Sequence, residues 1–394
     1  MSRRSPALRH RAALEIARSA ANRERNSLAQ SRFLRYLLLP VSLLRVLSGY
    51  KSFADPYIGS AALNRRGLHV WRVKRSHAIA ARRRKQLEHL VSGEDRDAYA
   101  ANGFVEKRDA LSPEDHRALL EELRALTAPA REMTEGEAVT RRIAVTPELL
   151  RSMPTLERFL ASPTWTGLTR YVGSFDAEPI VCIQTIFGAG SDGARSSDPQ
   201  TRLHMDTFHP TMKAWLFLED VAPDQGPFTY VPGSHRLDKR RLAWHKRRSI
   251  IASDAKAKGG AFRVEDAQLP RLRLPPRNVF AVPGNTLVVG DTFGLHARGL
   301  SLRPSTRVEI YASMRPNPFN PFVSLDTARL PLVRGRKAAI GWVLEDLLVR
   351  LGLTRRIWKD VGVVNPWQRR VAATAVPDAS LRQASPAGTS PPKG

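Results

Sequence analysis

Residues 201–230 read TRLHMDTFHPTMKAWLFLEDVAPDQGPFTY, and the rest of the chain is best interpreted outward from this stretch. His204 and Asp206 flank a single methionine, so on an extended strand, where alternate side chains share a face, both would point the same way. His296 follows a second apolar, strand-like run, in VVGDTFGLHARG. Two histidines and one carboxylate form the ligand set that suits non-haem Fe(II), so we expect these three residues to bind iron.

The composition indicates a globular protein that lacks disulfide or cysteine-cluster chemistry. A chain of 394 residues with 42% hydrophobic content can bury a substantial core, in one large domain with extensions or in two domains. The single cysteine, Cys182, excludes an intramolecular disulfide and a cysteine-based zinc cluster. We therefore expect a reducing, cytoplasmic location and a metal held by oxygen and nitrogen ligands.

The basic charge is concentrated at the two ends of the chain. The formal net charge is +26, of which residues 1–95 carry +14 and residues 321–394 carry +7. The central part carries only the small remainder. This distribution favours an anionic surface that contacts the extensions, and not an anionic ligand bound throughout the central fold.

The N-terminal extension begins with a basic arm of about 26 residues that we expect to be disordered. The apolar run at 33–47 is interrupted by Arg35, Pro40 and Arg45, which makes it too short and too charged to span a bilayer. It suits a peripheral membrane segment or a packed helix, whereas nucleic acid is less favoured because no base-reading module is present. The Arg-rich start also leaves an organellar transit peptide open.

The pattern downstream predicts many short strands with few βαβ units, which is typical of an antiparallel sandwich or barrel. A helix should start at Pro113 with Ser112 as its N-cap, and residues 129–178 suggest mixed helix and loop. Further strands are expected at 103–107, from Glu178 along EPIVCIQTIFGAG, along KAWLFLEDV, and at 278–282, 286–291 and 306–314, with helices at about 236–258 and 337–351. A jelly roll would let a strand-borne His-x-Asp and a distant histidine meet at its open end.

Two ordered motifs carry a family resemblance. LHMDTFHPTMKAWLFLEDVAPDQGPFTYVPGSHR, followed by GDTFGLHARGLSLRPSTR, resembles the phytanoyl-CoA dioxygenase family of Fe(II)/2-oxoglutarate-dependent oxygenases over roughly residues 96–318. The resemblance implies an α+β fold, with a double-stranded β-helix (jelly-roll) core, flanking helices and basic extensions. We accordingly expect four parts, namely an N-terminal extension at 1–95, an oxygenase domain at 96–320, a C-terminal helical extension at 321–376 and a disordered tail at 377–394.

The resemblance also implies roles for single residues. Fe(II) would be held by His204, Asp206 and His296, and dioxygen and 2-oxoglutarate would be the cosubstrates. Arg307, eleven residues after His296, matches the family position that clamps the distal carboxylate of 2-oxoglutarate, with Arg298 and Arg303 as competitors. Gln184 resembles a position that contacts the cosubstrate in related enzymes.

The expected reaction is hydroxylation. Related halogenases replace the carboxylate ligand by a small residue to admit halide, and this chain keeps Asp206. The substrate class stays open at this stage. A lipid, lipid-linked sugar or other small molecule at a membrane surface is one class, and a soluble metabolite, protein or nucleic acid is another. A non-catalytic basic docking protein on the same fold is the third.

Overall fold

A computed structural model describes residues 39–190, 198–324 and 333–369. The basic arm and the tail that we expected to be disordered lie outside these ranges. In the described residues, no helix is both long enough and apolar enough to cross a membrane.

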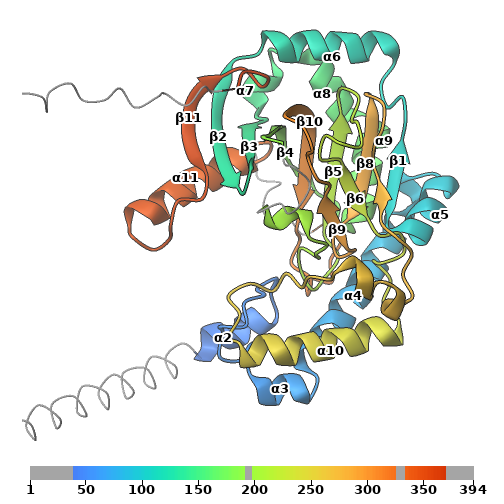
Figure 1. The fold of residues 1–394 in the computed structure, drawn as a ribbon, viewed down its shortest axis with the longest axis vertical. Coiled ribbons are helices and arrows are strands. Elements are labelled where there is room, and N and C mark those ends of the chain that lie inside the picture. Colours follow the sequence, from blue (N-terminus) through green and yellow to red (C-terminus); the bar gives the residue numbers. More distant parts are fainter. Residues whose placement is uncertain (1–38, 191–197, 325–332, 370–394) are drawn as a thin grey trace, which may run out of the picture.

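The core consists of two antiparallel sheets (Figure 1). The large sheet has eight strands in the order β1-β8-β5-β10-β4-β3-β2-β11, and the small sheet has the order β7-β6-β9. Their bounds are β1 Phe104–Lys107, β2 Ala128–Glu135, β3 Ala138–Ala144, β4 Ile180–Gly188, β5 Met212–Phe217, β6 Phe228–Tyr230, β7 Asn278–Val279, β8 Thr286–Asp291, β9 His296–Arg298, β10 Ser305–Met314 and β11 Lys359–Val364. Two facing sheets of this kind form the double-stranded β-helix that the sequence predicted.

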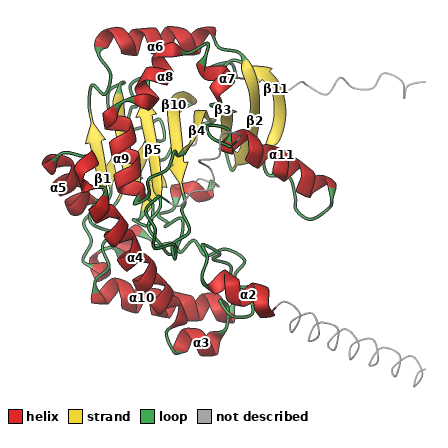
Figure 2. Ribbon diagram, turned by 180° about the vertical axis from the view of Figure 1, so that it is seen from behind, coloured by secondary structure: helices red, strands yellow, loops and turns green. Residues whose placement is uncertain are grey.

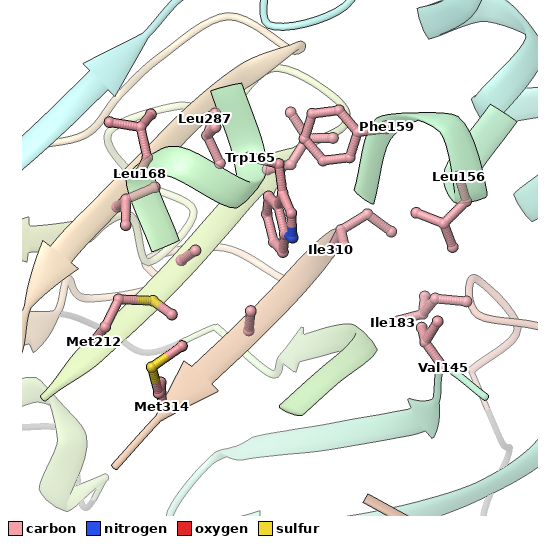
Figure 3. Close-up of a cluster of buried hydrophobic side chains, with 14 of the residues drawn as sticks. Val145, Leu156, Phe159, Trp165, Leu168, Ile183, Met212, Leu287, Ile310 and Met314 are labelled. Atoms are coloured by element: carbon pink, nitrogen blue, oxygen red, sulfur yellow. The ribbon is translucent and has the colours of Figure 1, made fainter. Parts of the chain in front are cut away.

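Helices cover the outer face of the large sheet (Figures 1 and 2). They are α6 Pro113–Ala125, α7 Pro147–Leu150, α8 Pro154–Ala161 and α9 Pro163–Gly173. Figure 3 shows the apolar cluster between them and the sheet, in which Trp165 lies near Ile310 and Met212 lies beside Met314. Alternate residues of the strands face the other way, so the opposite face is free to line the space between the sheets. That interior holds the aromatic residues Trp215, Phe217, Phe228, Tyr230 and Tyr311.

A second group of helices packs at one end of the sheets (Figures 1 and 2). It comprises α2 Leu39–Val46, α3 Ala61–Arg65, α4 Leu68–Gln86, α5 Gly93–Asn102 and α10 Lys239–Asp254. Phe53 and Val73, both fully buried, share an apolar cluster with Leu203 and Phe208 from the predicted metal-binding stretch. The main-chain N–H of Phe53 also donates to Ala257 at 2.9 Å. Phe53 and Val73 therefore pack the N-terminal segment against the stretch that carries His204 and Asp206.

Several local predictions are confirmed by the structure. Helix α6 starts at Pro113, and the Ser112 side chain accepts the N–H of Asp115. Strands β1, β4, β5, β8 and β10 lie where the alternation indicated, with β8 at Thr286–Asp291. Two helices, α10 and α11 Lys337–Arg350, match the helical patterns near positions 236–258 and 337–351. The expected strand at 278–282 is shorter, because β7 covers only its first two residues.

Two local predictions are wrong. Residues 129–178 are not only helix and loop, because β2 and β3 form a hairpin within them. The strands were not predicted because their sequence, AREMTEGEAVTRRIA, is too polar to show an apolar alternation. Arg141 is nevertheless buried in β3, where it forms an ion pair with Glu132 at 2.7 Å. The His-x-Asp motif also does not lie on a regular strand: His204 forms an isolated bridge and Asp206 lies in a bend.

The C-terminal extension contains β11, which pairs with β2, as well as a helix.

Candidate metal centre

The predicted triad is assembled by main-chain pairing. His204 and His296 exchange two backbone hydrogen bonds of 3.0 Å in an isolated antiparallel bridge. Directly paired residues place their side chains next to each other, and the two imidazole rings have centroids 4.6 Å apart. The third member, Asp206, is fixed by its N–H, which donates to Thr292 at 2.9 Å. The chain thus brings a ligand from 90 residues away to the same place as the first two.

One potential ligand atom from each triad residue lies within 4.8 Å of the other two. The Asp206 Oδ1 atom is 3.6 Å from His296 Nε2 and 3.9 Å from His204 Nε2. All three residues are buried, with less than a tenth of each exposed. This spacing suits a shared metal ion and not a set of direct hydrogen bonds, because each separation exceeds hydrogen-bond length.

The imidazole rings are oriented for metal binding. His204 Nδ1 donates to the carbonyl of Arg202 at 2.8 Å, and His296 Nδ1 donates to that of Gly294 at 2.9 Å. A proton held on Nδ1 leaves the Nε2 lone pair for a metal. The buried Nε2 of His296 has no hydrogen-bond partner within the described parts of the chain. A divalent cation at this point would use that lone pair, so the residues present fit Fe(II).

Basic side chains keep the carboxylate ligand ionised. Burial alone would raise the pKa of Asp206, but Lys213, His296 and Arg315 hold it well below its usual range. Its Oδ2 atom lies 2.7 Å from Lys213 Nζ and 3.3 Å from Arg315. Burial, helped by the neighbouring His296, lowers the pKa of His204 to about 3. At neutral pH the site therefore offers a charged carboxylate and an unprotonated His204, which are the forms that bind a metal.

The turn that carries His296 is held by Asp291. The Asp291 carboxylate accepts the N–H groups of Thr211 and Phe293 at 3.2 and 3.0 Å and the Tyr99 hydroxyl at 3.0 Å. These bonds connect the start of β5 to the turn after β8. On β5 itself, Trp215 packs against Phe228 with ring centroids 4.1 Å apart.

Arg307 and Gln184 belong to one buried network in the interior. Arg307 Nε donates to Glu309 Oε2 at 3.0 Å, and its Nη1 donates to the carbonyl of Gly226. Gln184 Nε2 donates to the other Glu309 oxygen at 2.6 Å, and Gln184 Oε1 accepts from Arg142 Nε at 2.8 Å. Glu309 is fully buried, so this network fixes the direction of the Arg307 fork.

The two competing arginines are placed differently. Arg298 lies two residues after His296 on the same face of β9, and its Nη1 pairs with the buried Asp198 at 2.8 Å. Arg303 is about half exposed and pairs with Asp224 outside the interior. The geometry therefore separates Arg303 from the site, whereas Arg298 and Arg307 both reach the interior.

Sequence reasoning missed four residues of the site. Lys51, Lys213 and Arg315 contact Asp206, and Glu309 contacts Arg307. Strand alternation could have found Glu309, because it shares a strand face with Arg307. The same rule could have placed Lys213 on the face of Trp215. No local signal marks Lys51, which is 155 residues from Asp206 in sequence and donates to its main-chain carbonyl at 2.5 Å.

A buried set of two histidines and one carboxylate, held between the sheets of a jelly roll, defines a non-haem iron oxygenase. The model of the phytanoyl-CoA dioxygenase family matches residues 99–261 of the chain. Together with the metal site, this match identifies an Fe(II)/2-oxoglutarate-dependent oxygenase. The match includes His204 and Asp206 but ends before His296 and Arg307. The fold places His296 beside His204 through their backbone pairing.

The chain is also similar to solved structures over part of its length. The epimerase SnoN, in complex with Fe3+, alpha-ketoglutarate and nogalamycin RO, is 18% identical, with a TM-score of 0.37 over 58% of this chain and 83% of that one. HygX from Streptomyces hygroscopicus, with nickel and 2-oxoglutarate bound, is 16% identical, with a TM-score of 0.35 over 57% and 86%. The carbocyclase SnoK from nogalamycin biosynthesis is 18% identical, with a TM-score of 0.34 over 57% and 83%. No curated protein matches the chain significantly.

Proposed function

We propose that the protein hydroxylates an amphiphilic small molecule, such as a lipid or a lipid-linked sugar, in a reaction that consumes 2-oxoglutarate and dioxygen. The observation that carries this proposal is the carboxylate of Asp206, which completes the triad within 4.8 Å of both histidines. A bound Fe(II) ion would supply the oxidative chemistry, namely the coupling of 2-oxoglutarate decarboxylation to the insertion of oxygen into a C–H bond.

The chain's own residues orient the reactants. His204 and His296 would present their Nε2 atoms to the metal, because backbone carbonyls hold both Nδ1 protons. Asp206 would occupy the third position as an anion, which leaves no small-residue gap for a halide. Lys213 and Arg315 limit its rotation through their ion pairs with Oδ2. These constraints support hydroxylation over halogenation.

Arg307 is our choice for the distal carboxylate of 2-oxoglutarate. Its Nε and Nη1 groups are already bonded within the interior, and in the described parts of the chain Nη2 has no partner. A guanidinium in a fixed direction with free N–H groups suits a carboxylate. Gln184 would act indirectly, by holding Glu309 in place.

A membrane surface is the proposed location of the substrate, within a reducing cytoplasmic compartment. Helices α2 and α11 lie toward the same side of the molecule in Figures 1 and 2. Both expose large apolar side chains, and they are flanked by basic residues. Those at least two-fifths exposed are Val41, Leu43, Leu44, Leu47, Ile340, Val343, Leu344, Leu347 and Leu351. Exposed apolar residues beside Lys and Arg suit an interface with anionic lipids.

The enzymatic part of the proposal is tested by succinate formation from 2-oxoglutarate. The purified full-length protein should form succinate only with Fe(II) and oxygen, and a total lipid extract should stimulate it. His204→Ala should abolish iron binding and turnover, whereas His89→Ala, which changes an exposed histidine, should retain both. Iron-independent turnover, or full activity in His204→Ala, would contradict the assignment. Mass spectrometry of the extract should show a product heavier by one oxygen atom.

A further inference from the structure

Three cationic side chains contact the metal ligand Asp206, and a fourth basic residue, Arg263, pairs through its main chain with the ligand His204. Lys213 and Arg315 contact the Asp206 carboxylate, and Lys51 contacts its main-chain carbonyl. Arg263 is paired through its main chain with His204. It also lies close enough to Lys51 that, with burial as the larger cause, it helps to lower the pKa of that lysine.

The charges in this cluster do not balance. In the described parts of the chain, Asp206 is the one carboxylate within ion-pair distance of any of the four side chains. In the same described parts, the guanidinium group of Arg263 has no hydrogen-bond or ion-pair partner. Binding of Fe(II) and of the 2-oxoglutarate dianion leaves the net charge of this cluster unchanged, because the charges of the two ligands cancel. The complete centre therefore keeps an excess of positive charge, which is costly unless an anion neutralises it.

The segment that carries Lys51 is held in place by hydrogen bonds from Arg72 and by a close contact with Gly260. The guanidinium of Arg72, on α4, donates to the carbonyls of Val46, Ser48 and Tyr50 at 2.7 to 2.9 Å. A Cβ atom on Gly260 would overlap the main chain of Lys51, so the two segments are in direct contact. This contact holds Lys51 beside the segment that leads to Arg263.

We propose that Lys51, Arg263 and Arg315 form a subsite for a phosphate group of the substrate, next to the iron centre. This inference rests on the proposed hydroxylase function and narrows its substrate class to a phosphate ester, soluble or lipid-borne. Two guanidinium forks and an ammonium group match the charge and the oxygen acceptors of phosphate. All three residues lie outside the segment that matches the family model, which ends at residue 261. Lys51 comes from the N-terminal segment, so the subsite depends on that segment.

Titration calorimetry with hexyl phosphate tests the subsite directly. The probe is added to full-length protein loaded with Fe(II) and 2-oxoglutarate under nitrogen. We expect saturable binding of hexyl phosphate, no binding of hexanol, and weakening by at least tenfold in Arg263→Gln and in Lys51→Met. Arg303→Gln is the matched control, because Arg303 is exposed to the same degree as Arg315 but pairs with Asp224. It should bind hexyl phosphate as the unaltered protein does.

The outcomes separate the subsite from the function. If unaltered protein forms succinate but does not bind hexyl phosphate, the subsite is wrong and the oxygenase assignment stands. Equal binding of hexanol, or unchanged affinity in both Arg263→Gln and Lys51→Met, would also overturn the subsite. Competition by inorganic phosphate would support a phosphate head as the recognised group. Competition by phosphatidylglycerol vesicles, but not by phosphatidylcholine vesicles, would support a lipid source over a soluble one.

Discussion

The Nζ of Lys51 donates a 2.5 Å hydrogen bond to the main-chain carbonyl of Asp206, so the N-terminal segment touches the loop that carries an iron ligand. Arg72 connects the same two parts, since it bonds three carbonyls of residues 46–50 and its guanidinium lies 4.1 Å from the Phe208 ring. A basic extension that might have been a separate anchor therefore supports the metal centre.

Arg72→Met should destabilise the protein and loosen the metal centre. The substitution keeps the apolar stem but leaves three carbonyls without a donor, one of them in the buried Val46, at a cost of roughly 3 kcal/mol. Urea unfolding measures the loss, and iron affinity should fall with it. Arg75→Met, an exposed position on the same helix, is the control and should change stability by less than about 0.5 kcal/mol. Equal stabilities of the two variants would show that Arg72 does not fasten the segment.

Arg307→Lys should raise the KM for 2-oxoglutarate by about 10- to 100-fold, because lysine replaces a planar fork with a single point donor. Steady-state succinate formation at varied 2-oxoglutarate measures the effect, and the iron content should stay unchanged. Arg298→Lys is the informative comparison, since this residue also reaches the interior but already pairs with Asp198. A larger rise in KM for Arg298→Lys than for Arg307→Lys would show that Arg298, and not Arg307, binds the distal carboxylate of 2-oxoglutarate.

Acid should unfold the metal-free protein through its buried histidines. Burial lowers the pKa of His69, His209 and His235 to about 3, whereas the unfolded histidine has a pKa near 6.5. Below pH 6.5 these histidines bind protons in the unfolded chain but not in the folded chain. The free energy of unfolding therefore falls as the pH drops toward 3. Each histidine should contribute a slope of about 1.4 kcal/mol per pH unit in this window. The pKa of Asp291, raised by burial, opposes this trend with one proton.

Denaturant unfolding at several pH values gives these slopes. In His69→Leu the dependence on pH should become shallower by the share of one histidine. Equal stability at pH 7 and pH 5 would mean that the buried rings are protonated in the folded protein.

Binding to anionic vesicles should depend on the exposed leucines. The double change Leu44→Glu and Leu344→Glu removes apolar contact from both α2 and α11 and adds negative charge, so co-sedimentation with phosphatidylglycerol vesicles should fall by about tenfold. Leu302→Glu is the matched control, because Leu302 is as exposed as Leu344 but lies in neither helix. Equal losses in the two proteins would indicate nonspecific charge repulsion instead of a docking face.

The sequence alone determined the chemistry of the centre and much of the local structure. His204, Asp206 and His296 are recognisable because ligand types and motif order are written in the chain. The Ser112 cap and strand β8 follow from side-chain alternation and capping, which depend only on near neighbours. These features need no knowledge of the rest of the fold.

Tertiary structure decided what surrounds that chemistry. The backbone bridge joins His204 to His296 although His204 is not on a regular strand, and Glu309 occupies part of the Arg307 fork. Long-range packing brings Lys51 to Asp206 and leaves the apolar side of α11 exposed. Such contacts join residues that are far apart in sequence, and they form only when burial of the whole core selects one arrangement. Local patterns therefore identify the ligands, and the packed fold selects their neighbours.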